Sequence, residues 1–158
     1  MEKKTTYHEQ TSINNTVKLR EVLATLPDFC RNYFRAMEPT TTAKTRISYV
    51  YDIRLFLHFL CAQNPYFNKY DSITQITLSD LENLTPMDIE EYLEYLKYYT
   101  DEQGRSHTNS ERGIKRKLAA LRSFYAYYYK PNSQSLRMHR RVFRHLHLHI
   151  SSLHSLQQ

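Results

Sequence analysis

The sequence has no tryptophan, only two glycines and five prolines, and no acidic residue after Glu111. So few glycines leave little room for turns that need a positive φ, which favours long helices over a fold of many tight β-turns. No apolar run approaches the length of a membrane-spanning helix, and the polar N-terminus has no apolar signal segment. We therefore expect a cytoplasmic protein with no membrane partner.

The sequence is also poor in the motifs of metal and nucleotide chemistry. The two cysteines, Cys30 and Cys61, each lie in an apolar periodic stretch, and neither belongs to a zinc-type Cys or Cys/His spacing. Two buried, reduced thiols are the simplest interpretation. A Gly-rich phosphate loop is absent from the sequence, so nucleotide hydrolysis has no support. We predict no metal, no cofactor and no small-molecule substrate.

Positive charge is concentrated at the C-terminal end. The 158 residues carry a net charge of +6, yet the chain up to Glu111 holds 12 Lys and Arg against 16 acids, and the chain from Arg112 onward holds 10 Lys and Arg. A basic excess favours a polyanionic partner such as nucleic acid. The alternative is a helical protein–protein interaction module, whose basic end would meet an acidic partner or the acidic 80–102 region of a second copy.

Apolar residues recur at helical spacing through most of the chain, and no long stretch alternates with the period of a strand. The strongest start signal is Thr85-Pro86-Met87-Asp88, which combines a cap, a proline at the first position and an acid in the first turn. The expected helices are 15–26, starting at Asn15 or Thr16, then 27–37, 43–63, 86–99 and about 111–130, with one further turn in 79–84. Residues 1–14 are expected to be frayed. The predicted class is all-α.

The last expected helix begins with a basic face. Spacings of three and four residues bring Arg112, Lys115 and Arg116 together, away from the apolar stripe of the helix. Arginine can fork onto phosphate or guanine, lysine supplies a point charge, and free N–H groups near Ser110 favour phosphate. The pattern predicts DNA contact, and the alternative is an ordinary solvated basic face.

A second patch starts the 43–63 helix. It consists of Thr42, Lys44, Thr45 and Arg46. Hydroxyls and basic groups at a helix N-terminus suit phosphate oxygens. Simple N-capping by Thr41 or Thr42 is the competing interpretation.

Three segments together resemble the tyrosine site-specific recombinases, the Xer and phage-integrase family. In chain order they are TTAKTRISYVYDIRLFLHFL, SDLENLTPMDIEEYLEYL and SERGIKRKLAALRSFYAYYYK, and residues 27–130 fit in order and spacing. The match is to the N-terminal core-binding, SAM-like domain of that family. It implies a SAM-like orthogonal bundle of four or five helices over 15–130, with double-stranded DNA and other recombinase protomers as partners.

The resemblance also implies which residues meet DNA. In the family, the two helices that match 43–63 and 111–130 face the major groove and its phosphates. The corresponding positions here are Thr42, Lys44, Thr45, Arg46, Ser110, Arg112, Arg116 and Arg122, to which the face analysis adds Lys115. Arg122 could instead brace the helix bundle.

The catalytic set of that family is not found in the sequence. Its chemistry needs a separate C-terminal domain with two arginines, a lysine, a His-x-x-Arg element and a nucleophilic tyrosine. No histidine of this chain has an arginine three residues later. We interpret Tyr127, Tyr128 and Tyr129 as packing residues of the last helix. The prediction is a DNA-binding domain that positions a recombination half-site and is not an enzyme alone, rather than a complete active recombinase.

Residues 131–158 differ from the rest of the chain. They hold five of the eight histidines, no acid and no single apolar face. We interpret them as an irregular basic tail, with an out-of-frame or truncated end as a hypothesis. Metal binding by His145, His147 and His149 is the weaker alternative to an unstructured tail, because no carboxylate or cysteine lies nearby in the sequence.

Overall fold

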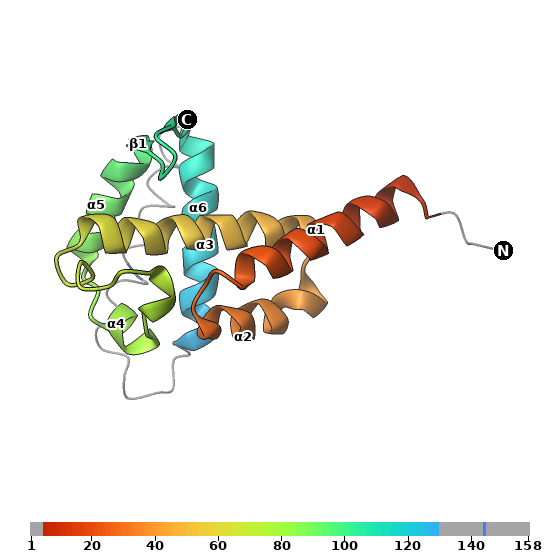
Figure 1. Ribbon diagram of the computed structural model, residues 1–158, viewed down its shortest axis with the longest axis horizontal. Helices are drawn as coiled ribbons and strands as arrows, with labels where there is room; N and C mark the ends of the chain where they lie inside the picture. The colour runs from red at the N-terminus through yellow and green to blue at the C-terminus, as the bar shows by residue number, and fades with distance from the viewer. Residues whose placement is uncertain (1–4, 130–143, 145–158) are drawn as a thin grey trace.

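The computed structural model describes residues 5–129 and residue 144, and helices dominate this part of the chain (Figure 1). Its α-helices are α1 (Tyr7–Leu23), α2 (Asp28–Met37), α3 (Ala43–Gln63), α4 (Leu78–Glu82), α5 (Pro86–Lys97) and α6 (Glu111–Tyr128). Short 3-10 helices, η1 (Glu38–Thr40) and η2 (Ile73–Gln75), precede α3 and α4. The predicted all-α class is confirmed, and the predicted bounds of the third helix agree with α3.

Side-chain caps explain where the later helices begin. The hydroxyl of Thr42 accepts the N–H of Thr45, that of Thr85 accepts the N–H of Asp88, and that of Ser110 accepts the N–H of Gly113. Each bond satisfies a backbone donor that the first turn of a helix otherwise leaves free. The predicted start at Thr85 is confirmed, and Thr42 is the cap of α3 out of the two predicted candidates, Thr41 and Thr42.

Helix α1 begins earlier than the sequence analysis predicted. The Thr6 hydroxyl accepts the N–H of Glu9 at 3.3 Å, and the Glu9 carboxylate accepts the N–H of Thr6 at 2.8 Å. This reciprocal cap starts a helix in a polar segment that has no apolar stripe. The prediction of a frayed segment through residue 14, with a helix start at Asn15 or Thr16, is therefore wrong from Tyr7 onward.

A small β-hairpin joins α5 to α6 and was missing from the prediction. Strand β1 (Tyr98–Thr100) pairs antiparallel with β2 (Ser106–Thr108), with Tyr99 opposite His107. In the turn, the Asp101 side chain accepts the N–H groups of Gln103 and Arg105, and Gly104 adopts a φ of 75°. Strands of three residues are too short to show the alternation that identifies a strand in a sequence.

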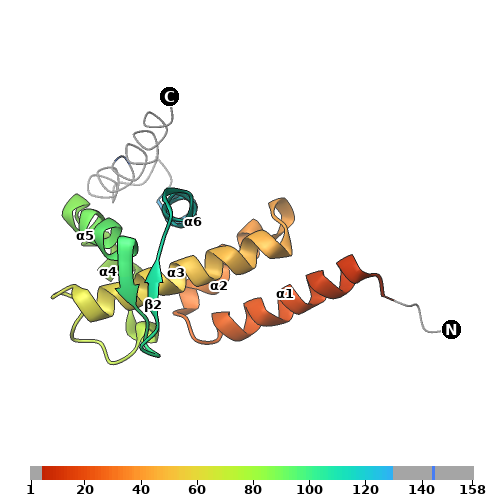
Figure 2. The same cartoon turned by 90° about the horizontal axis from the view of Figure 1, so that it is seen from above.

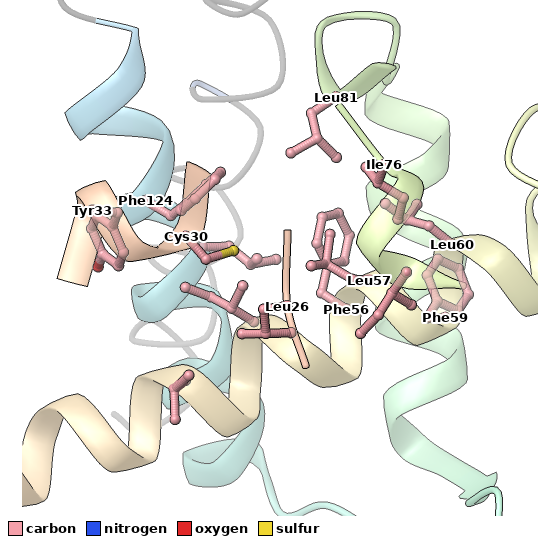
Figure 3. Packing of buried hydrophobic residues seen from close by; sticks show 14 of the residues in the cluster. Leu26, Cys30, Tyr33, Phe56, Leu57, Phe59, Leu60, Ile76, Leu81 and Phe124 are labelled. Atoms are coloured by element: carbon pink, nitrogen blue, oxygen red, sulfur yellow. The ribbon is translucent and has the colours of Figure 1, made fainter. Parts of the chain in front are cut away.

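One hydrophobic core connects the helices (Figure 3). Figures 1 and 2 place α3 between α1 on one side and α6 on the other, so α3 is the central helix. The core runs along α3 from Leu26, Cys30, Tyr33 and Phe124 at one end to Phe56, Leu57, Phe59, Leu60, Ile76 and Leu81 at the other. Among the described residues, no helix combines the length and the apolar character needed to cross a bilayer.

Both cysteines are free thiols, as predicted. Cys30 is fully buried, and burial raises the pKa of its thiol to about 12. Cys61 is only half-buried, which differs from the prediction of two buried thiols, and its pKa is raised by the same cause. Both groups therefore stay protonated near neutral pH, as expected of thiols that serve packing.

The buried hydroxyl of Tyr92 gives a test of the core. Its ring packs against Phe56 and Phe59 with centroid distances of 4.9 and 5.0 Å, and its hydroxyl has no hydrogen-bond partner within the described residues. A buried polar group without a partner costs about 1–3 kcal/mol. Tyr92→Phe should therefore raise the free energy of unfolding by about 1 kcal/mol in urea titrations followed by circular dichroism.

The matched control for this test is Tyr33→Phe. The Tyr33 hydroxyl donates to Ser123 at 2.8 Å, so its removal should lower the free energy of unfolding by about 1 kcal/mol. If both variants lose the same stability, the Tyr92 hydroxyl has a partner and the expectation is wrong.

Candidate nucleic-acid interface

The start of α3 presents one exposed cation beside a capping threonine. The Thr42 hydroxyl lies 3.1 Å from the backbone nitrogen of Thr45 and 3.0 Å from the Thr45 hydroxyl. The hydroxyl of Thr42 is therefore used to cap the start of α3. Lys44 is exposed, and its side chain has no hydrogen bond or ion pair with any described residue. Lys44 is thus the group at this helix start that can meet an anion without giving up an internal contact.

Arg46 has a structural role that the sequence did not indicate. The residue is buried, and its Nη1 donates to the carbonyl oxygens of Glu38 at 3.1 Å and Thr41 at 2.7 Å. These bonds fasten η1 to the first turn of α3. Both acceptors belong to the backbone, and none of the ion pairs formed within residues 5–129 gives Arg46 a carboxylate partner.

The start of α6 resembles the start of α3, because each has a capping hydroxyl and one exposed cation. Ser110 is the cap, with its hydroxyl 3.2 Å from the backbone nitrogen of Gly113. Arg112 is exposed and has no partner among the described residues, whereas Lys115 is half-buried and takes part in an internal interaction. Arg112 therefore corresponds to Lys44 as the free cation of its helix start.

A buried carboxylate fixes the crossing of α3 and α6. Asp52 of α3 accepts two hydrogen bonds from Arg116, from Nε at 3.1 Å and from Nη2 at 2.9 Å, while Lys117 lies 3.5 Å away. The Asp52 side chain is 3% exposed and that of Lys117 9%, but the side chain of Arg116 is 52% exposed. Burial lowers the pKa of Lys117, and Asp52 opposes that shift.

Asp52 and Lys117 were absent from the predicted site. The sequence did contain one relevant signal. Asp52 lies in the middle of the expected 43–63 helix, next to apolar positions that form its buried stripe. A buried ion needs a partner of opposite charge, so a basic residue on another helix could have been expected. Which one could not be read from the sequence, because Arg116 lies 64 positions away along the chain.

The remaining predicted residue on α6, Arg122, lies nearer the bundle. It is half-buried and has no hydrogen bond or ion pair with a described residue. Its neighbour Ser123 accepts the hydrogen bond from Tyr33 of α2, so this part of α6 faces another helix. Arg122 therefore does not belong to the group formed by Ser110, Arg112, Lys115 and Arg116 at the start of α6.

The two predicted patches are separated along α3. Thr42 and Asp52 are ten positions apart, which corresponds to about 15 Å along a helix axis. The start of α6 docks near Asp52 through Arg116, whereas the start of α3 is tied to η1 through Arg46. The nine predicted residues therefore do not form a single cluster. Positive charge lies at the start of α3 and, separately, at the start of α6.

A hollow beside the crossing was not predicted. Its volume is about 760 Å³, and α3, the β-hairpin and α6 line it. Tyr99 stacks between Tyr95 and His107, with centroid distances of 4.9 and 5.0 Å. The hollow is also lined by the basic side chains of Arg54, His58, Arg105, Arg116 and Lys117.

Ion pairs hold the hairpin next to this hollow. Asp101 contacts Arg105 Nε and His107 Nε2, both at 2.8 Å, and His58 Nδ1 of α3 contacts Glu102 at 2.8 Å. Hydrogen bonds from His107 and Arg105 place the pKa of Asp101 well below its usual range. Burial lowers the pKa of His58, and the charge of Glu102 opposes this shift.

The tyrosines at the end of α6 pack against other elements. The Tyr128 hydroxyl donates to the carbonyl of Phe29, and the Tyr129 hydroxyl donates to the carbonyl of Leu78 at 3.3 Å. Burial raises the pKa of Tyr128 to about 12 and shifts that of Tyr129 upward as well. Hydroxyls that donate to backbone carbonyls and resist ionisation are poorly placed for attack on phosphorus.

Within the described residues, no group of three or more His, Cys, Asp and Glu side chains is arranged to hold a metal ion. The histidine cluster predicted as a weak metal candidate, His145, His147 and His149, lies outside those residues. The rest of the predicted tail, residues 131–158 apart from residue 144, lies outside them as well.

Comparison with known proteins gives a family match over most of the described chain. Residues 31–132 match the model of the phage integrase N-terminal SAM-like domain. The chain is 33% identical over 101 residues to tyrosine recombinase XerC of Caldanaerobacter subterraneus subsp. tengcongensis, which covers 63% of this chain and 27% of that protein. It is 31% identical over 122 residues to tyrosine recombinase XerS of Lactococcus lactis subsp. cremoris, which covers 73% of this chain and 32% of that protein.

The chain thus spans about a third or less of the length of these curated relatives. No solved structure matches it.

The helix crossing is tested by Asp52→Asn. This change leaves the buried ammonium of Lys117 without a counter-charge, so the free energy of unfolding should fall by about 2–3 kcal/mol. Arg116→Gln should cost about 1 kcal/mol, because Arg116 is half exposed and Lys117 still faces Asp52. Urea denaturation measures both. Equal, small losses would show that the carboxylate does not hold the crossing.

The hairpin is tested by pH. A carboxyl whose folded pKa is depressed stabilises the fold above its unfolded pKa of about 3.9 and loses that contribution as the pH falls. Asp101→Asn should lower the melting temperature at neutral pH and make its decline toward acid pH shallower. Asp71→Asn is the control, since Asp71 is exposed. An unchanged acid profile for Asp101→Asn would contradict the assigned role.

Proposed function

Because this chain belongs to the phage integrase N-terminal SAM-like domain family, we propose that it binds duplex DNA as the non-catalytic core-binding domain of a tyrosine recombinase. In this role it positions one half of a recombination site during DNA integration or recombination. Other recombinase protomers are the proposed protein partners. The chemistry of strand cleavage is assigned to sequence outside the matched region, residues 31–132.

One observation carries the proposal. Lys44 and Arg112 are exposed, carry no internal partner among the described residues, and lie at the starts of the two long helices that cross. Cations at helix starts act together with the free N–H groups of the first turn, and both favour phosphate oxygens. A solvated face would also expose single cations, but it would not require both to lie beside capped helix starts.

Arg116 can keep its ion pair with Asp52 and contact a phosphate at the same time. Its bonds to Asp52 use Nε and Nη2, and half of its side chain stays exposed. Nη1 is therefore available to a phosphate while the ion pair is kept. Specificity by Arg116 would be limited, because the pair with Asp52 restricts the orientations of the guanidinium plane.

The alternative function, a helical protein–protein interaction module, depends on acidic side chains of the 80–102 region. Two of these side chains are engaged within the fold, which weakens this alternative. Asp80 accepts hydrogen bonds from Tyr66, Tyr70 and Thr77, and Asp88 accepts from Asn64 and Thr85. Both carboxylates therefore hold the fold. A second copy would meet a less acidic surface in the 80–102 region than the sequence suggests.

The proposal is tested with fluorescence anisotropy of a random-sequence duplex across a salt series. The logarithm of the association constant should fall linearly with the logarithm of the salt concentration. The double variant Lys44→Gln with Arg112→Gln should bind more weakly and lower the slope by about two, one for each lost phosphate contact. Arg116 is left unchanged so that the helix crossing stays intact.

The matched control is Lys18→Gln with Lys69→Gln, which removes the same charge from exposed lysines outside both helix starts. It should keep the slope of the unmodified chain. Equal losses in the two double variants would show a diffuse charge effect and contradict the assigned contacts. Failure of the unmodified chain to bind even at low salt, together with concentration-dependent association in sedimentation velocity, would favour the interaction module.

A further inference from the structure

A second cationic feature lies away from the α3–α6 crossing. An open groove of about 440 Å³ is lined by α1, α2, η1 and the first turn of α3. Four arginines line it, namely Arg20 of α1, Arg31 and Arg35 of α2, and Arg46 of α3. Figure 1 shows these three elements side by side in one half of the molecule. The sequence analysis singled out only Arg46, and for a different surface.

The charge of the groove is not balanced from within. Glu38 is the one acid in its lining, and none of the ion pairs in the described part of the chain joins Glu38 to the four arginines. Arg20, Arg31 and Arg35 are exposed, and their side chains have no hydrogen-bond or ion-pair partner among the described residues. Guanidinium groups that converge without counter-charges repel one another, and an anion relieves that repulsion.

Arg46 gives the groove a fixed cation. Its residue is 8% exposed, and its two hydrogen bonds to backbone carbonyls both use Nη1. The remaining guanidinium nitrogens therefore keep their donors for a ligand. The side chain is already immobilised by the fold, so little conformational entropy is lost when a ligand binds.

The apolar part of the lining strengthens this effect. Leu19, Leu23 and Phe34 lie on the wall of the groove beside the arginines. Apolar walls lower the local dielectric constant, which increases the attraction between a cation and a bound anion. Arginine forks match the tetrahedral oxygens of a phosphate better than isolated ammonium groups do.

We propose that this groove binds a phosphate-bearing anion, with Arg46 as its fixed contact and Arg20, Arg31 and Arg35 closing on the ligand. The chemistry is that of a phosphate ester or an oligophosphate. The phosphate can come from the DNA backbone or from a free oligophosphate in solution. Neither Lys44 nor Arg112 lines the groove, so binding there does not require the contacts proposed for those two side chains.

The test is the melting temperature of the full chain with sodium tripolyphosphate, compared with sodium chloride at equal ionic strength. Tripolyphosphate should raise the melting temperature by several degrees, because a ligand that binds only the folded state stabilises it. In the double variant Arg31→Gln with Arg35→Gln the apparent affinity should fall at least about tenfold. Both residues are exposed and their side chains have no hydrogen bond or ion pair with a described residue, so the variant should fold.

The control Lys69→Gln with Lys97→Gln removes the same charge from exposed lysines that do not line the groove. It should keep the tripolyphosphate response. No response beyond that of sodium chloride in the unmodified chain, or equal responses in both double variants, would overturn the proposal.

Duplex DNA then distinguishes the two sources of phosphate. If the groove takes DNA phosphates, Arg31→Gln with Arg35→Gln should lower the salt slope of DNA binding by about two. An unchanged slope with a lost tripolyphosphate response would assign the groove to a free oligophosphate. The variant Lys44→Gln with Arg112→Gln should keep the tripolyphosphate response, so failure at the helix starts is distinguishable from failure at the groove.

Discussion

The buried carboxylate of Asp52 is the constraint on which the arrangement of the two long helices depends. A carboxylate with 3% of its side chain exposed is costly unless cations compensate it, and Arg116 and Lys117 of α6 do so. Because these partners are neighbours in sequence, they fix both the position of α6 along α3 and its rotation. The basic face of α6, including Arg112 one turn earlier, is consequently turned outward.

Capping hydroxyls are the second recurring device. Thr42 and Ser110 both lie where DNA contact was predicted, and both use their hydroxyls on their own helices. Their contribution to an interface is therefore the exposure of a well-formed helix start, with Lys44 and Arg112 as the charged groups beside it. Capping and phosphate binding are compatible here, since a cap satisfies one N–H of the first turn and leaves others free.

Charge along the chain and charge on the surface are distributed differently. The chain up to Glu111 holds more acids than bases, yet it supplies the four arginines of the groove between α1, α2 and α3. Several of its acids are used internally: Asp52 holds the crossing, Asp80 anchors two tyrosines, and Asp101 closes the hairpin. Internal use of carboxylates leaves basic groups on the surface even where the local net charge is negative.

The sequence by itself determined the all-α class, the bounds of α3 and the capped start at Thr85, and it narrowed the cap of α3 to Thr41 or Thr42, because helical periodicity and capping are local properties. It also indicated the family, through three segments in order. Only the tertiary structure decided that Arg46 is buried, that Arg116 pairs with Asp52, and that arginines from three helices share one groove. These contacts join residues far apart in the chain, and no local pattern encodes which distant side chain will compensate a buried charge.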